Sequence, residues 1–174
     1  RIVDGTGNIH AGIHPIKANE RPQKGHYAAH TLNCNTGSIG VAMACMRGAK
    51  EHPFNVGSHP MTDRQLAVFV KLVAQLATDY SIPITRQTVL THAEVQPTLG
   101  ITQRGKWDIN WLVGWKKPLK PVEAGDLLRA VIKENMGPKP KVADPRPDLP
   151  ATAPNWLSRL LERLFAFFKL GDDK

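Results

Sequence analysis

Apolar and polar residues alternate along this chain with two different periods. In residues 61–80 and again in residues 122–135, apolar side chains recur at steps of three and four. Such steps place side chains on one face of a helix, so both segments predict amphipathic helices, and the first is expected to pack on a sheet. Thr62 and Gln65 have the spacing of a capping box at the start of the first helix, and its predicted apolar face extends to Tyr80.

Shorter apolar segments predict strands. Residues 1–3 and 8–11 flank a glycine-rich turn, a pattern typical of a β-hairpin. Residues 38–45 form a near-continuous apolar run of strand length, which is typical of a strand covered on both faces. Residues 88–91 predict another buried strand, with His92 at its carboxyl end. Ligands tend to bind at that edge of open α/β sheets, so the elements together predict an α/β fold with a ligand site near His92.

The end of the chain has a different composition. Residues 137–154 contain six prolines among charged and small residues, so we predict a proline-rich linker that cannot form a core. In residues 155–170 the apolar and polar positions separate cleanly at helical periodicity, which predicts an amphipathic helical tail over residues 155–174. Its apolar face would either dock on the domain or on a second copy, or lie on an anionic membrane surface.

Charge and cysteine content narrow the possible partners. The formal net charge is +8, which favours an anionic partner such as nucleic acid, an acidic cell-wall polymer or a lipid surface. The basic residues are scattered and form no nucleic-acid-binding motif, so we expect no nucleic acid. No run approaches the roughly 20 apolar residues of a membrane span, and no secretion signal is visible, so we expect a soluble protein. Cys45 lies in an apolar run, which favours a buried thiol over a disulfide with Cys34.

Three residues are candidates for chemistry: His92, Lys106 and Asp108. A neutral imidazole and a carboxylate are both zinc ligands, so His92 and Asp108 could be two of the donors of a zinc site. Taken alone the spacing decides little, because a histidine or lysine in a loop is more often solvated or simply hydrogen-bonded.

Several short motifs gain meaning when they are taken together. They are residues 4–12, residues 30–41, the helix that begins near residue 61, Thr-His-Ala-Glu-Val at 91–95 and Gly-Lys-Trp-Asp-Ile at 105–109. Over roughly residues 1–135 the chain resembles the zinc-dependent N-acetylmuramoyl-L-alanine amidases of the phage lysozyme type, relatives of the peptidoglycan recognition proteins. Within that family it is similar to phage or prophage endolysins.

The resemblance implies roles for individual residues. His92 and Asp108 match two zinc ligands of the family, and Lys106 matches the lysine that assists at the scissile carbonyl. His30 and Asn35 match positions at the rim of the groove, where they would meet polar groups of the substrate. Ordinary hydrogen bonding within the loop is the alternative for both.

Two further features follow from the comparison with the family pattern. Glu94 is either a carboxylate that orients a zinc-binding imidazole or a solvated surface residue. The family's first zinc histidine and its water-activating tyrosine or glutamate would precede Arg1, so we expect residues 1–136 to be an N-terminally incomplete amidase domain. His10 or His14 could substitute as a ligand, but the resemblance does not support this.

The resemblance therefore implies an α/β amidase domain with a mixed central β-sheet flanked by helices. The expected reaction is hydrolysis, by zinc-activated water, of the amide between N-acetylmuramic acid and L-alanine in peptidoglycan. The protein would be made in the cytoplasm and act in the periplasm or cell wall. The alternatives are a non-catalytic peptidoglycan-binding module and a membrane-active lytic protein that acts through residues 155–170.

Overall fold

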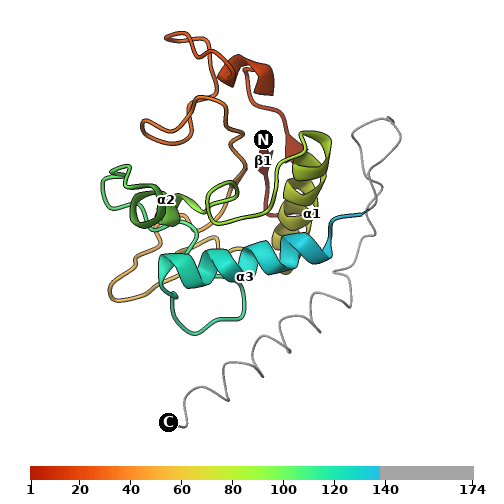
Figure 1. The fold of residues 1–174 in the computed structure, drawn as a ribbon. Helices are drawn as coiled ribbons and strands as arrows, with labels where there is room; N and C mark the ends of the chain where they lie inside the picture. The colour runs from red at the N-terminus through yellow and green to blue at the C-terminus, as the bar shows by residue number, and fades with distance from the viewer. Residues whose placement is uncertain (138–174) are drawn as a thin grey trace.

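The computed structural model describes residues 1–137 (Figure 1). The predicted tail and all of the predicted linker beyond its first residue lie outside the described residues. The elements, in chain order, are β1 (Ile2–Val3), β2 (Ile9–His10), the short 3-10 helix η1 (Ile16–Asn19), β3 (Ala42–Met43), α1 (Asp63–Asp79), α2 (His92–Leu99) and α3 (Pro121–Glu134).

The three strands form one mixed sheet in the order β2-β1-β3. β1 is antiparallel to β2, with Ile2 opposite His10, and parallel to β3, with Ile2 opposite Ala42. The turn between β1 and β2 is held by the Asp4 carboxylate, which accepts hydrogen bonds from the backbone N–H groups of Thr6 and Asn8. The predicted hairpin and the α/β class with a mixed sheet are therefore confirmed.

The predicted strand over residues 38–45 is much shorter than its apolar pattern suggests. Only Ala42 and Met43 are in strand conformation, and Ala42 and Ala44 are exposed. The expectation of a strand covered on both faces is therefore wrong. The physical reason is that β3 is an edge strand, and its glycine and alanine residues bury little surface.

α1 packs against β1 and β3, as expected of the first amphipathic helix. Thr62 is its N-cap, and the Thr62 hydroxyl accepts a hydrogen bond from the Gln65 N–H at 3.1 Å. The Gln65 side chain does not complete the capping box, because its Oε1 accepts no hydrogen bond from the described residues, while its Nε2 donates to the carbonyls of Val3 at 2.8 Å and Ala44 at 3.3 Å. Gln65 thus joins α1 to the sheet. The predicted apolar face ends before Tyr80, which is 53% exposed.

α3 packs against both α1 and α2 and closes the core (Figure 1). Its bounds agree with the predicted helix to within one residue at each end, and Leu128, Val131 and Ile132 are buried. Within residues 1–137, no helix has the length and apolar character needed to cross a membrane. Cys34 and Cys45 are both free thiols, but both are only partly buried, so the prediction of a buried thiol at Cys45 is wrong in its burial.

The predicted strand over residues 88–91 is wrong. Thr88 lies in a turn in which its N–H and hydroxyl contact Thr85, and Thr91 is the N-cap of α2. His92 is therefore the first residue of a helix and does not follow a strand. Thr91 and Glu94 have capping-box spacing, and this local signal for a helix start outweighed the β-propensity of the preceding residues.

Candidate active site

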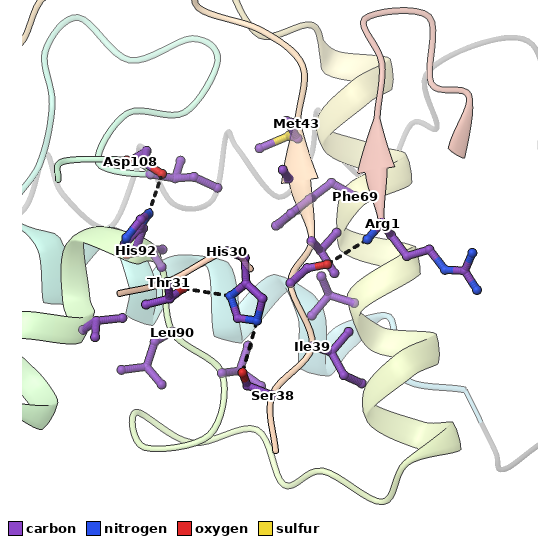
Figure 2. Close-up of a pocket in the computed structure, with 18 of the residues that line it drawn as sticks. Arg1, His30, Thr31, Ser38, Ile39, Met43, Phe69, Leu90, His92 and Asp108 are labelled. Carbon is purple, nitrogen blue, oxygen red and sulfur yellow. Dashed lines mark hydrogen bonds and ion pairs between the residues drawn. The ribbon is translucent and has the colours of Figure 1, made fainter. Parts of the chain in front are cut away.

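His92 and Asp108 face each other at the N-terminal end of α2 (Figure 2). His92 Nδ1 lies 3.3 Å from Asp108 Oδ2, with side chains 18% and 63% exposed, respectively. The backbone holds the same juxtaposition, because the Ala93 N–H donates to the Asp108 carbonyl at 2.7 Å. The loop after α2 thus returns to the start of the helix, where a carboxylate is favoured by the helix dipole. This return explains how two residues separated by sixteen positions meet.

The other ring nitrogen of His92 also has a partner within the protein. His92 Nε2 lies 3.0 Å from Gln103 Oε1. Gln103 is buried, and its backbone N–H donates to Gln96 Oε1 on the last turns of α2 at 3.0 Å. Sequence reasoning missed Gln103, because a glutamine within a loop carries no periodicity and matches no metal-ligand pattern.

His30, His92 and Asp108 line one cavity of about 1350 Å³. Its walls are largely apolar and come from β3, α1, α3 and the segment before α3, as represented by Met43, Phe69, Leu128 and Trp111. Pockets that combine apolar walls with a few converging polar groups are typical of ligand sites. Both predicted zinc ligands, His92 and Asp108, therefore share one cavity with His30, one of the two predicted substrate-binding residues.

Both ring nitrogens of His30 have partners within its own segment. Nδ1 lies 2.8 Å from Thr31 Oγ1 and Nε2 lies 3.1 Å from Ser38 Oγ (Figure 2). The ring is also packed against Gly40, where an added Cβ would lie 2.6 Å from it. Burial lowers the pKa of His30, and the nearby His92 lowers it further, so the neutral ring is favoured.

Asn35 organises the segment that carries His30. Its Oδ1 accepts hydrogen bonds from the backbone N–H groups of His30 at 2.8 Å and Thr31 at 3.0 Å. The structure therefore brings His30 and Asn35 together and gives each a role within the loop. Their contact with a substrate stays a prediction.

Lys106 lies on the same loop as Asp108, two residues before it, and is exposed. Among the described residues it is not part of the cavity wall, which the chain joins at Trp107. Arg104 and Gly105 both have positive φ values, of 53° and 72°, so the backbone turns sharply just before Lys106. A role of Lys106 at the scissile carbonyl stays a prediction.

One comparison with known proteins decides the family. The model of the N-acetylmuramoyl-L-alanine amidase family matches residues 2–109. This range includes the three-stranded sheet, α1, α2 and both His92 and Asp108. The chain belongs to this family. No curated protein and no solved structure matches it. Membership supports peptidoglycan amidase activity at the level of the family.

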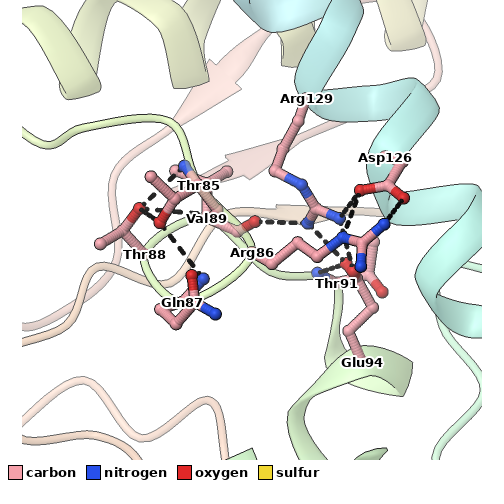
Figure 3. Close-up of polar contacts among 9 residues, drawn as sticks. All are labelled: Thr85, Arg86, Gln87, Thr88, Val89, Thr91, Glu94, Asp126 and Arg129. Carbon is pink, nitrogen blue, oxygen red and sulfur yellow. Dashed lines mark hydrogen bonds and ion pairs between the residues drawn. The ribbon is translucent and has the colours of Figure 1, made fainter. Parts of the chain in front are cut away.

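In this amidase-family domain Glu94 has contacts other than those predicted (Figure 3). It is fully buried, so it is not a solvated surface residue. Its Oε1 accepts from Arg129 Nη2 at 2.8 Å, and its Oε2 accepts from Arg129 Nη1 at 3.0 Å and from the Thr91 N–H at 2.9 Å. Arg129 also donates to Asp126 and to the Val89 carbonyl. Glu94 thus anchors the start of α2 to α3, while Gln103 contacts the His92 ring.

The donor geometry fits part of the zinc site that the amidase family implies. Zinc binds nitrogen and oxygen at about 2.0–2.1 Å in tetrahedral sites, so two ligand atoms lie about 3.3 Å apart. The 3.3 Å between His92 Nδ1 and Asp108 Oδ2 agrees with this spacing. Within residues 1–137, however, no group of three His, Cys, Asp or Glu side chains could hold a metal ion. His92 and Asp108 therefore fit as two donors of a site that needs at least one more.

Proposed function

We propose that this chain is a zinc-dependent N-acetylmuramoyl-L-alanine amidase that hydrolyses the amide between N-acetylmuramic acid and L-alanine in peptidoglycan. The observation that carries the proposal is the approach of His92 Nδ1 to Asp108 Oδ2 at the wall of a large cavity. It occurs in a chain whose match to the amidase family includes both residues.

The residues around the cavity have separate roles in this proposal. His92 and Asp108 would hold the zinc ion, which when bound polarises the amide carbonyl and lowers the pKa of a water molecule toward about 7. Lys106 would move its ammonium toward the carbonyl oxygen and stabilise the negative charge that develops there. His30 and Asn35 would shape the rim that receives the substrate, and the apolar walls would exclude water from the reacting amide.

We further propose an endolysin-type role, in which cleavage of peptidoglycan in the periplasm or cell wall leads to lysis. The net charge of +8 supports attraction to anionic envelope polymers. The apolar and basic faces of residues 155–170, which lie outside the described residues, would let the tail lie on an anionic membrane surface.

Incubation with purified peptidoglycan sacculi tests the reaction. We expect the full chain to contain zinc by elemental analysis and to release stem peptides with a free L-alanine amino terminus. His92→Ala and Asp108→Ala should each lower both zinc content and release by at least about 100-fold, because each removes one donor. His52→Ala is the matched control, since the His52 side chain is 87% exposed.

The same experiment separates the two alternatives. A non-catalytic peptidoglycan-binding module is favoured by the lack of a third donor among residues 1–137, and it would bind sacculi but release no amino termini. A protein that acts only by disturbing membranes would leave sacculi intact, because purified sacculi contain no lipid bilayer. Either result would refute the amidase proposal.

A further inference from the structure

We propose that Asn110 is a specificity-determining residue whose side-chain oxygen accepts a hydrogen bond from a secondary amide N–H of the peptidoglycan substrate. This inference rests on the proposed amidase function and names the chemical group that this part of the cavity recognises. It concerns a residue with no predicted role, and it follows from a buried acceptor that no described residue satisfies.

The first step is the state of the buried polar side chains on the cavity wall. Among the described residues these are Thr91, Glu94, Asn110 and Arg129. Glu94 and Arg129 bind each other through two hydrogen bonds. Thr91 Oγ1 and Asn110 Oδ1 have no hydrogen-bond partner among the described residues. Thr91 is the N-cap of α2, where capping-box geometry turns its hydroxyl toward the first helical turn. Asn110 lies in the loop between α2 and α3 and has no helix end to cap.

The second step is the chemistry of the missing partner. Asn110 is 3% exposed, so its oxygen has given up hydrogen bonds to bulk water without gaining one from the described residues. Such a group destabilises the fold and needs an explanation, and a ligand that supplies the missing hydrogen is a physical one. An amide oxygen has no hydrogen to donate, so the ligand must be the donor.

The third step is the position of Asn110 relative to the proposed reaction. Asn110 follows Asp108 by two residues, so their Cα atoms are at most about 7 Å apart. A substrate whose scissile amide lies beside Asp108 would place its neighbouring amides within reach of Asn110. Two of these carry an N–H: the peptide bond that follows L-alanine and the acetamido group of N-acetylmuramic acid. Asn110 would select a substrate that presents this donor.

The fourth step is the rigidity of the segment that carries Asn110. Its carbonyl accepts a hydrogen bond from the Leu119 N–H at 2.9 Å. The next residue, Trp111, is buried, and its indole N–H donates to the Trp115 carbonyl at 2.7 Å. The Trp111 ring also packs on Phe54, with ring centroids 5.8 Å apart. A backbone fixed in this way holds the acceptor in place, so little ordering is needed when the substrate binds.

Isothermal titration calorimetry with the metal-free full chain tests the inference without hydrolysis. The first probe is N-acetylmuramoyl-L-alanine methylamide. Two analogues each replace one N–H by oxygen: the methyl ester removes the peptide N–H, and a 2-acetoxy analogue removes the acetamido N–H. We expect one analogue to bind about 10-fold more weakly than the methylamide, because a buried hydrogen bond is lost. The analogue that does so identifies which amide Asn110 recognises.

Asn110→Leu removes the acceptor and approximately keeps the shape of the side chain. It should weaken binding of the methylamide about 10-fold but leave binding of the weakened analogue unchanged, because that analogue has no N–H to lose. The variant should also need at least as much urea to unfold as the unaltered protein, since an apolar group replaces an unsatisfied one. Thr98→Val is the matched control. Thr98 Oγ1 is likewise buried without a partner among the described residues, but Thr98 is not on the cavity wall.

A merely structural role for Asn110 gives a different pattern. Asn110→Leu would then unfold at lower urea and bind all three probes more weakly by the same factor. That pattern would overturn the inference, as would analogues that bind as tightly as the methylamide, or no binding of the methylamide to the unaltered chain. If sacculi are cleaved and Asn110→Leu binds the probes normally, only this inference fails. If binding follows the expected pattern but no peptide is released from sacculi, only the proposed hydrolysis fails.

Discussion

Gly125 shows how a single residue can depend on a buried charge. A Cβ at this position in α3 would overlap the carboxylate of Glu94. Glycine within a helix is normally about 1 kcal/mol less favourable than alanine, so its presence here reflects the space that the ion pair needs. We expect Gly125→Ala to lower the free energy of unfolding by about 3 kcal/mol, because it overpacks the site and displaces Glu94. Urea denaturation measures this change.

Gly137→Ala provides the comparison for that variant. Within residues 1–137, no atom lies within 4 Å of a Cβ built at Gly137, and its backbone has no positive φ. This substitution should change the free energy of unfolding by less than about 0.5 kcal/mol. Equal effects of the two substitutions would show that the Glu94 carboxylate does not limit the space at Gly125.

Lys106 supports a second prediction at the scale of a residue. Because its side chain is exposed, Lys106→Ala should leave the unfolding midpoint and the zinc content unchanged. If its ammonium stabilises the oxyanion, kcat for peptide release should fall by about 100–1000-fold while KM changes little. The exposed Lys117→Ala is the control. An unchanged kcat would remove Lys106 from the mechanism.

Between elements, the ion pair of Glu94 with Arg129 connects α2 to α3. Both side chains are almost fully buried, at 0% and 6% exposure, and Glu94 extends from the first turn of α2 toward Arg129 on α3 (Figure 3). Removing one partner of such a pair leaves an uncompensated charge, so we expect Arg129→Met to lower the free energy of unfolding by about 3–5 kcal/mol. Since the pair sets the position of α2, zinc affinity at His92 should fall as well.

A double variant checks that the pair acts as a unit. Glu94→Gln combined with Arg129→Met should be less destabilising than the sum of the two single substitutions, because no unpaired charge remains. Glu123→Gln is a suitable control on the same helix, since its side chain is 46% exposed and its contact with Lys120 is 3.8 Å long. Additive effects of the two single substitutions would contradict direct coupling.

For the molecule as a whole, stability should decline in acid partly through Asp126. Arg86 and Arg129 lower the pKa of this carboxyl group to about 2, from an unfolded value of about 3.9. A carboxylate with a lowered pKa in the folded state stabilises the fold above the unfolded value, and the contribution is lost as pH falls through the folded value. We therefore expect Asp126→Asn to be less stable than the unaltered protein at pH 6. The difference in the free energy of unfolding between the two proteins should shrink between about pH 4 and pH 2. Acid titrations followed by tryptophan fluorescence measure it. A difference that stays constant with pH would exclude the ionisation of Asp126 as the cause of the stabilisation.

The sequence by itself determined the elements whose signals are local. α1, α3 and the hairpin of β1 and β2 were predictable, because helical periodicity, end signals and a glycine turn act within a few residues of one another. The resemblance to the family also nominated His92 and Asp108 before their positions were known. The strand predicted at residues 88–91 failed for a local reason, because the capping residues Thr91 and Glu94 start a helix there.

Only the tertiary structure decided which distant side chains meet. Glu94 and Arg129 are 35 residues apart, and Gln103 Nε2 bonds to a carbonyl 71 residues away. No periodicity or spacing encodes such contacts, because they depend on how α2, α3 and the intervening loops pack around one core. The distance between His92 and Asp108 was decided in the same way. The chain supplied an imidazole and a carboxylate, but the return of the loop to the start of α2 brought their donor atoms together.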